Sequence, residues 1–345
     1  MEVNYLTGIK PTGRIHIGNY ISAIKPTIEY LKENDNKTVY FFIADYHALT
    51  GNVNPSELNF YTKNLMVSYC AIFKYFENQI FTGKNNEIYF YRQSQIPEIF
   101  ELYWILSCYT AKGLLNRNHS YKEIVENNIN HDKDPDKSIY MGLFNYPILM
   151  ASDILMFQPK YVPVGKDQLQ HIEITNDIAQ KINHYYNKSI FNYIKPKIQD
   201  NKFVLLGKDG NKMSKSNNNI LPLFSPVNEI EKCIYSIKTN SKDEGEPKYP
   251  EESNISEFYK AFATNNQYES YVNDLKNGIS WKQAKDTVLL EMENQISYLR
   301  RNFYYYYMNN FRLVKEKFEY NEMIIKSEAN KMLKNIKEEI GMEVL

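Results

Sequence analysis

Short apolar runs alternate with stretches of helical apolar spacing over about the first 220 residues of the chain. Five such runs occur, at residues 3–9, 39–44, 88–91, 161–164 and 203–206. After the first run, Pro11 and Gly13 turn the chain into a helical segment that starts near His16. Because strands that alternate with helices pair in parallel and are covered on both faces, the pattern predicts an α/β domain with a doubly wound parallel sheet.

The segment from Asn54 to Glu57 predicts the start of a long helix. Asn54 can cap the helix, Pro55 suits its first turn, and Glu57 can close a capping box. The apolar spacing that follows predicts about five helical turns, from Pro55 toward Tyr75.

The pattern changes near residue 220, where the short strand-like runs end and helical spacing continues to the last residues. Asparagines and prolines between residues 217 and 226 predict a hinge. Further along, a capping-box pattern that begins at Ser280 opens a helix through about Arg301. We therefore expect two domains, an α/β domain at 1–220 and an all-α domain at 221–345.

Composition and charge narrow the classes of protein to which the chain can belong. Of its 345 residues, 43% are hydrophobic and 24% are charged, which excludes a disordered or collagen-like chain. The 41 basic and 41 acidic residues cancel, so any RNA contact must be a local patch. Three widely spaced cysteines predict no disulfide framework. We expect neither a leader nor a membrane span, and hence a cytoplasmic location.

The tetrapeptide His16-Ile17-Gly18-Asn19 follows the first predicted strand and opens the first predicted helix. In a doubly wound sheet this position lies at the carboxyl edge, where ligands bind. Free backbone N–H groups there can meet a phosphate, Gly18 leaves room for a nucleotide base, and His16 and Asn19 add donors. On their own, the same four residues also fit an ordinary capping turn.

A second segment, 207–216, combines two glycines with the pentapeptide KMSKS after an apolar run. A glycine-hinged loop can close over ATP, and Lys212 and Lys215 can then neutralise charge that develops on pyrophosphate. Alone, the segment also fits a solvated basic loop. Read together, HIGN and KMSKS resemble the two signatures of class I aminoacyl-tRNA synthetases.

Four longer segments extend this resemblance: GIKPTGRIHIGNY, IADYHALTGNVNP, MASDILMFQPKYVPVGKDQLQHIEITNDIAQKIN and GKDGNKMSKS. In this order they are similar to tryptophanyl-tRNA synthetases of the bacterial type, over most of the first 220 residues. The resemblance implies a Rossmann-like catalytic domain, a helical anticodon-binding domain and a homodimer. It also implies L-tryptophan, ATP with Mg²⁺ and tRNA(Trp) as substrates, with tryptophanyl-adenylate as the intermediate.

A helix predicted after Pro147 carries Tyr146, Met150 and Asp153 on one face, at positions i, i+4 and i+7. A carboxylate among apolar neighbours is costly to bury unless a donor satisfies it, and an indole N–H is such a donor. By itself Asp153 also fits a surface residue or an inter-helix salt bridge. The resemblance implies instead that Asp153 accepts the indole hydrogen bond.

The resemblance assigns further residues to the two substrates. The tryptophan pocket would also include Leu6, His47, Val162, Val164 and Gln168. The ATP site would include Lys10, Pro11, Thr12, Gly18, Asn19, Gly165, Lys166, Asp167, Phe203, Lys212, Met213, Ser214, Lys215 and Ser216. We expect catalysis by positioning and charge stabilisation, without a nucleophile, from His16, Asn19, Lys212 and Lys215. From its place after a strand, His47 fits a satisfied structural histidine equally well.

Several features depart from the family pattern. Lys10 stands where many members have glutamine, and Leu6 replaces an aromatic residue that would stack on the indole. Asparagines 217–219 replace the glycine that usually follows KMSKS. Some members carry an iron–sulfur cluster, which needs four cysteines, whereas this chain has three. We therefore expect no cluster and no separate metal site.

Two other interpretations stay open from the sequence. A tyrosyl enzyme of the same fold is disfavoured by the helix face that carries Asp153. A synthetase-like protein that binds RNA or a regulatory partner without catalysis would be expected to lose the phosphate-handling residues, which are present here. The tRNA contact is assigned to a modest basic face with Arg300, Arg301 and Arg312, which also fits a solvated helical surface.

Overall fold

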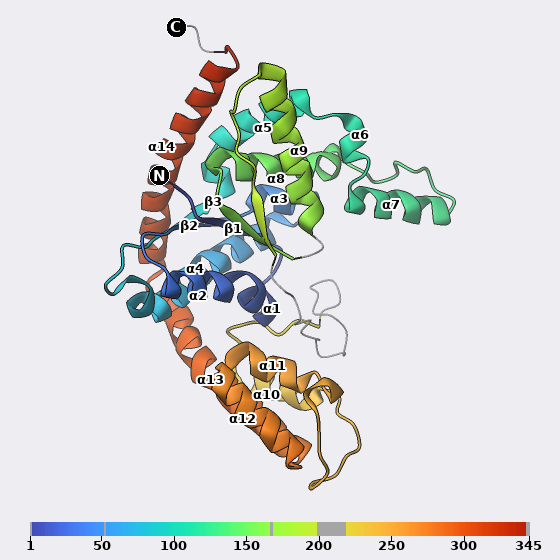
Figure 1. Cartoon of the computed structure of the whole chain (residues 1–345), viewed down its shortest axis with the longest axis vertical. Coiled ribbons are helices and arrows are strands. Elements are labelled where there is room, and N and C mark those ends of the chain that lie inside the picture. The colour runs from blue at the N-terminus through green and yellow to red at the C-terminus, as the bar shows by residue number, and fades with distance from the viewer. Residues whose placement is uncertain (1, 52, 166–167, 199–218, 343–345) are drawn as a thin grey trace.

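Five parallel strands form one sheet in the order β3-β2-β1-β4-β5 (Figure 1). The structure is a computed structural model that describes residues 2–51, 53–165, 168–198 and 219–342. The strands are β1 (Tyr5–Ile9), β2 (Thr38–Ile43), β3 (Glu87–Arg92), β4 (Tyr161–Val164) and β5 (Lys195–Ile198). Their order reverses direction between β1 and β4, and in doubly wound sheets ligands bind at the carboxyl ends of the strands near such a point. The predicted doubly wound parallel sheet is confirmed.

Alternate side chains of the central strands enter two separate apolar clusters, one on each face of the sheet. On β2, Val39 and Phe41 pack with α1, α2 and α4, whereas Tyr40 and Phe42 pack with α5, α8 and α9. The helices of this half are α1 (Ile17–Asn19), a π-helical turn (Tyr20–Ile24), α2 (Lys25–Glu33), α3 (Asp45–Ala48), α4 (Pro55–Phe81), α5 (Glu98–Tyr109), α6 (Lys112–Leu115), α7 (His119–Asn130), α8 (Met141–Phe157) and α9 (Leu169–Tyr186). Short 3-10 turns cover Leu49–Gly51 and Gln93–Gln95.

Helix α4 begins where the sequence predicts and continues further. Asn54 Oδ1 accepts a hydrogen bond from the Ser56 N–H (2.9 Å), in place of the capping box predicted with Glu57. The helix reaches Phe81, about two turns beyond the prediction. It continues because its inward side chains stay buried as far as Ile80, so tertiary packing outweighs the weakening local pattern.

β5, at the edge of the sheet formed by the described residues, is a strand that the apolar pattern did not predict. Its residues, Lys195-Pro196-Lys197-Ile198, include two lysines and a proline. Charged residues and proline are tolerated at sheet edges, where one side of the strand has no hydrogen-bonded neighbour. The apolar run at 203–206, which was predicted as a strand, lies outside the described residues.

Helices account for the regular structure after residue 226 in the described part of the chain. They are α10 (Val227–Ser236), a 3-10 turn (Pro250–Glu252), α11 (Ile255–Phe262), α12 (Asn265–Lys276), α13 (Trp281–Tyr304), a π-helical turn (Tyr305–Asn309) and α14 (Phe311–Glu339). The predicted capping box of α13 is present, because the Ser280 N–H donates to Gln283 Oε1 (2.7 Å) and the Gln283 N–H donates to Ser280 Oγ (3.2 Å). No helix within the described ranges is both long and apolar enough to cross a membrane.

The last helix, α14, leaves the helical half and packs along β3 of the sheet (Figure 1). The rings of Phe318 and Phe90 stack with centroids 5.8 Å apart, and Ile325 joins the apolar cluster around α5, α8 and α9. At the end of β3, Arg92 Nε and Nη2 each lie 2.7 Å from a carboxylate oxygen of Glu322. The expected all-α domain at 221–345 therefore includes a helix that packs on the α/β domain, and the division near residue 220 stays a prediction.

Candidate active site

Predicted or candidate site residues follow the carboxyl ends of four neighbouring strands, and three of them have polar side chains. Lys10 follows β1, and His47 lies in α3 just after β2. Gln93 directly follows β3, and Gly165 directly follows β4. Because the strands are parallel, their carboxyl ends share one edge of the sheet. This edge is the candidate site, and Gln93 is the residue of these four that the sequence did not single out.

His16 caps the N-terminus of α1, and Asn19 fixes its ring. The Asn19 N–H donates to His16 Nδ1 (3.3 Å), and the His16 N–H donates to Asn19 Oδ1 (3.3 Å). With Nδ1 as the acceptor, a neutral ring carries its proton on Nε2, which provides a donor on the other side of the ring. A Cβ on residue Gly18 would lie 2.9 Å from His16 Nδ1. Any larger residue at position 18 would therefore crowd the His16 ring in its capped position.

The segment that follows KMSKS is paired with the HIGN segment. The Ile17 N–H donates to the Leu221 carbonyl (3.0 Å), and the Leu223 N–H donates to the Ile15 carbonyl (3.0 Å). Residues on either side of His16 and Pro222 thus form a short antiparallel contact. Eight predicted ATP-site residues lie outside the described residues: Lys166, Asp167, Phe203, Lys212, Met213, Ser214, Lys215 and Ser216.

Asp153, on α8, is the centre of a buried polar cluster. The residue is 1% exposed, so the surface alternative is wrong. His47 Nε2 lies 2.9 Å from Asp153 Oδ2, and Gln93 Nε2 donates to Oδ1 (2.8 Å) and Oδ2 (3.0 Å). Burial raises the pKa of the Asp153 carboxyl above its usual range, while the hydrogen bonds from His47 and Gln93 act in the opposite direction. These two donors favour the charged form.

The Asp153 cluster has hydrogen-bonding capacity left over. An ionised carboxylate has about four acceptor sites. The contacts from His47 and Gln93 use three of them, which leaves one on Oδ1. Gln93 Oε1 and His47 Nδ1 are also buried without a partner among the described residues. Because the buried polar groups of a structural cluster are normally paired, this spare capacity is typical of a binding site.

Tyr146 lies beside this cluster and connects it to the β1 turn. Its ring centroid is 6.5 Å from that of His47, and its hydroxyl lies 3.1 Å from both His171 Nε2 and Asn118 Nδ2. Lys10 Nζ lies 5.6 Å from the centre of the Tyr146 ring. Although Lys10 is exposed as a residue, desolvation of its ammonium lowers the pKa of Lys10. The structure thus brings together four predicted residues: Lys10, His47, Tyr146 and Asp153.

The remaining described site residues lie in an apolar cluster, at the start of α9 and in the turn after β1. Three of them are buried in the apolar cluster around α5, α8 and α9: Leu6, Val162 and Val164. Met150 is partly buried against that cluster, and Gln168 lies at the start of α9. In the turn after β1, Pro11 is buried and Thr12 is exposed.

The sequence missed three side chains that contact predicted site residues: Gln93, Asn118 and Ser120. Gln93 lies two residues beyond the strand predicted at 88–91, as His47 lies three residues beyond the strand predicted at 39–44, so its position was a usable signal. Asn118 caps α7, far from any strand end, and its contact with the Tyr146 hydroxyl arises from tertiary packing. No local pattern indicates such a contact.

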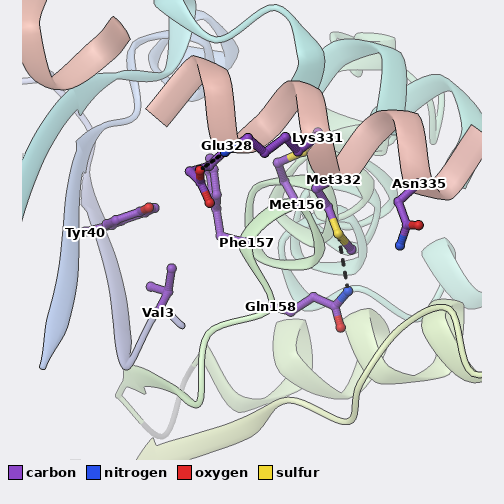
Figure 2. A pocket seen from close by; sticks show the side chains of 9 residues that line it. All are labelled: Val3, Tyr40, Met156, Phe157, Gln158, Glu328, Lys331, Met332 and Asn335. Atoms are coloured by element: carbon purple, nitrogen blue, oxygen red, sulfur yellow. Dashed lines mark hydrogen bonds and ion pairs between the residues drawn. The ribbon is translucent and has the colours of Figure 1, made fainter. Parts of the chain in front are cut away.

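A separate pocket of about 350 Å³ opens at the opposite, amino-terminal edge of the sheet (Figure 2). Val3 precedes β1 there, and Gln158 precedes β4. Met332 and Asn335 of α14 complete the rim, and Gln158 Nε2 lies 3.8 Å from Met332 Sδ. None of the predicted site residues lines this pocket. It is therefore distinct from the candidate active site.

Comparison with known proteins places this fold and site in a family. The family described as tRNA synthetases class I (W and Y) matches residues 1–297, and the chain belongs to this family. Within it, the tryptophan–tRNA ligase of Neisseria meningitidis is 37% identical over 342 residues, which cover 99% of this chain and 98% of that protein. The tryptophan–tRNA ligase of Pseudomonas aeruginosa is 40% identical over 306 residues, which are 88% of this chain and 66% of that longer protein.

Solved structures agree with this assignment. Tryptophanyl-tRNA synthetase from Campylobacter jejuni, complexed with ADP and tryptophan, has a TM-score of 0.80 and 33% sequence identity, and the match covers 98% of this chain and 100% of that one. Tyrosyl-tRNA synthetase from Archaeoglobus fulgidus has a TM-score of 0.61 and 16% identity, covering 88% of this chain and 90% of that one. The second likeness concerns the fold alone.

Proposed function

We infer that the protein is a tryptophan–tRNA ligase. The observation that carries this proposal is the buried Asp153 carboxylate at the carboxyl edge of the sheet, with one acceptor site still open for an N–H donor. The match to the Neisseria ligase over nearly the full length of both chains supports the same substrate. An indole N–H supplies the donor, and the apolar residues of the surrounding cluster suit its rings.

The proposed reaction has two steps. A carboxylate oxygen of tryptophan attacks the α-phosphorus of ATP, so that a new P–O bond forms as the bond to pyrophosphate breaks. A hydroxyl of the terminal adenosine of tRNA(Trp) then attacks the carbonyl carbon of the adenylate, and AMP leaves. Neither step needs a covalent bond to the protein, so catalysis depends on positioning and on stabilising developing charge.

ATP is proposed to bind over the HIGN segment. The expectation of several free N–H groups is wrong, because the N–H groups of Ile17 and Asn19 donate to the Leu221 carbonyl and to His16 Nδ1. The ring of His16 and the backbone of Gly18 are therefore the parts of this segment proposed to lie beside the phosphates. The pairing of Leu221 with Ile17 supports a shared site, because Lys215 is only six residues before Leu221 in the sequence. Mg²⁺ is proposed to arrive with ATP as part of the substrate. No group of three or more metal-ligating side chains occurs in the part of the chain that the structure describes.

Selectivity against tyrosine and phenylalanine is proposed to come from Asp153. Phenylalanine has no donor for the buried acceptor, and the hydroxyl of tyrosine lies at the end of its ring, in a different place from an indole N–H. Binding either amino acid in the pose of tryptophan would therefore strand a buried charged oxygen. Sites that expect a hydrogen bond can reject analogues by roughly 10⁴–10⁵-fold without editing. Because a carboxylate can also accept from a phenol, the preference for tryptophan over the tyrosyl alternative is supported mainly by the match to the Neisseria tryptophan–tRNA ligase.

The proposed partners are tRNA(Trp) and a second copy of the chain, in the cytosol. Arg300 is committed to Glu293 (2.6 Å) and to the Ser225 carbonyl (2.7 Å), so it is unsuited to RNA. Arg301 stacks on Tyr298 and remains the better candidate for an RNA contact.

Four large exposed side chains lie on or beside α5, α8 and α9, in the α/β half of the chain: Trp104, Tyr140, Met141 and Tyr185. Their exposure supports a dimer contact on this surface.

Amino-acid-dependent ATP–pyrophosphate exchange tests the proposed function directly. The purified protein is assayed with tryptophan, tyrosine and phenylalanine, and charging of tRNA(Trp) is measured separately. Exchange that depends on tryptophan alone is the expected result. Exchange with tyrosine would show that tyrosine is the substrate, and the assignment to this class of enzyme would stand. A folded protein that binds ATP but exchanges with none of the three would point to the regulatory alternative.

Gly18→Ala is expected to lower kcat for this exchange by roughly tenfold, because a Cβ 2.9 Å from His16 Nδ1 displaces the ring from its capped position. Gly142→Ala is the matched control, since Gly142 lies in α8 with open space around the added methyl group. Exchange kinetics and thermal unfolding are measured for both variants. An equal loss of rate in both would count against the requirement for glycine beside His16.

A further inference from the structure

Gln93 is an uncharged side chain that contacts the Asp153 carboxylate at two points. It is fully buried, and its Nε2 lies 2.8 Å from Oδ1 and 3.0 Å from Oδ2 of Asp153. An ionised carboxylate can only accept, so the amide must present its NH₂ group and turn its oxygen away. Contact with both oxygens restrains rotation of the carboxylate about its last bond. His47, which contacts Oδ2 alone, leaves that rotation free.

The turn that carries Gln93 is anchored on both sides. Arg92, just before it, makes a two-point contact with Glu322 of α14, with both distances 2.7 Å. The N–H of Ser94, just after it, donates to Asp45 Oδ1 (3.0 Å). Gln93 is therefore held between two fixed neighbours, and its amide has a defined place from which to direct the carboxylate.

Building on the proposed ligase function, we propose that Gln93 is a positioning residue for amino-acid specificity, whose amide holds the Asp153 carboxylate with its open acceptor site toward the indole N–H. Gln93 acts through Asp153 and does not itself touch the reacting atoms. Loss of the Gln93 amide leaves Oδ1 of Asp153 without a described partner. The carboxylate can then turn about its last bond, so its open acceptor site no longer points in one fixed direction. Both changes weaken recognition of an N–H donor in particular.

The test combines removal of the amide with removal of the indole N–H. Wild type and Gln93→Met are assayed by ATP–pyrophosphate exchange with tryptophan and with 3-(1-benzothiophen-3-yl)alanine, in which sulfur replaces the N–H. Methionine keeps the length of the side chain but provides no donor. We expect the preference for tryptophan, as a ratio of kcat/KM values, to fall by roughly tenfold in Gln93→Met, with the KM for ATP unchanged.

The matched control is Gln95→Met, the same substitution at an exposed position of the same turn. It is expected to leave the preference at the wild-type value. If Gln93→Met lowers kcat/KM for both amino acids by the same factor, the residue only supports the fold, and the proposal is overturned. Should Gln93→Met fail to fold, Gln93→Asn keeps an amide but draws it back by one methylene, and a reduced preference is again expected.

A double variant separates positioning from direct contact. In the Asp153→Ala background, Gln93→Met should have no further effect on the tryptophan preference, because the group that it positions is gone. An undiminished effect would mean that Gln93 reads the indole itself and would contradict the positioning role. Absence of tryptophan-dependent exchange in the wild type is a different failure, since that result would reject the proposed function before Gln93 is tested.

Discussion

Asp153→Ala is expected to lower kcat/KM for tryptophan by roughly 100-fold in ATP–pyrophosphate exchange, which corresponds to about 3 kcal/mol. The reason is the loss of a buried charged acceptor for the indole N–H, at a residue that is 1% exposed. Exchange with tyrosine and phenylalanine should change much less, so selectivity falls together with activity. Kinetic constants for all three amino acids provide the measurement.

The stability of that variant has to be measured alongside its kinetics. Removal of the carboxylate leaves the donors of His47 and Gln93 buried and unpaired, which destabilises the fold by about 3 kcal/mol. Asp153→Asn is the better-matched variant, because it preserves the shape of the side chain and removes the charge. Asparagine keeps one carbonyl acceptor, so its selectivity reports the contribution of the charge. A folded Asp153→Ala protein with wild-type selectivity would show that the indole is recognised elsewhere.

Lys215→Ala is expected to reduce kcat for exchange by roughly 10²–10³-fold, while the KM for tryptophan changes little. An ammonium that meets charge developing on pyrophosphate acts mainly in the transition state, and losing one such donor costs about 3–4 kcal/mol there. The measurement is exchange at saturating tryptophan and ATP. Thermal unfolding should be unaffected.

Lys208→Ala is the matched control for Lys215→Ala, because Lys208 belongs to the same segment but lies outside KMSKS. It should retain most of the wild-type rate. Similar losses in both variants would indicate a general effect of positive charge rather than a specific contact. In that case the assignment of Lys215 to the leaving group would have to be withdrawn.

Three strands match their predicted runs to within a residue at each end, because each contains a short apolar segment. The runs at 39–44, 88–91 and 161–164 match β2, β3 and β4, of which β2 is buried along its whole length as expected for a central parallel strand. β5 was missed, because its lysines and proline suit an edge. Helix α8 was expected after Pro147 but begins at Met141, since packing of the helix against α5 and α9 outweighs the hydrogen bond that proline cannot donate.

Residues of the candidate site could be predicted from the sequence where they follow a predicted strand. His16 and His47 could be placed at the carboxyl edge because each follows an apolar run. Gln93 has no charge and belongs to no motif, so its contact with Asp153, 60 residues further along the chain, becomes visible only in three dimensions. The same holds for the anchoring of its turn by Glu322, 230 residues from Arg92.

The pairing of α14 with β3 also has a consequence for synthesis of the protein on the ribosome. Glu322 and Phe318 emerge after every other described element except the end of α14 itself, so β3 and Arg92 lack these partners during most of translation. A chain that is released early leaves the side of the Phe90 ring that Phe318 covers without that partner, on a strand at the edge of the described sheet, which favours aggregation. Completion of the proposed tryptophan pocket is thereby linked to completion of the polypeptide.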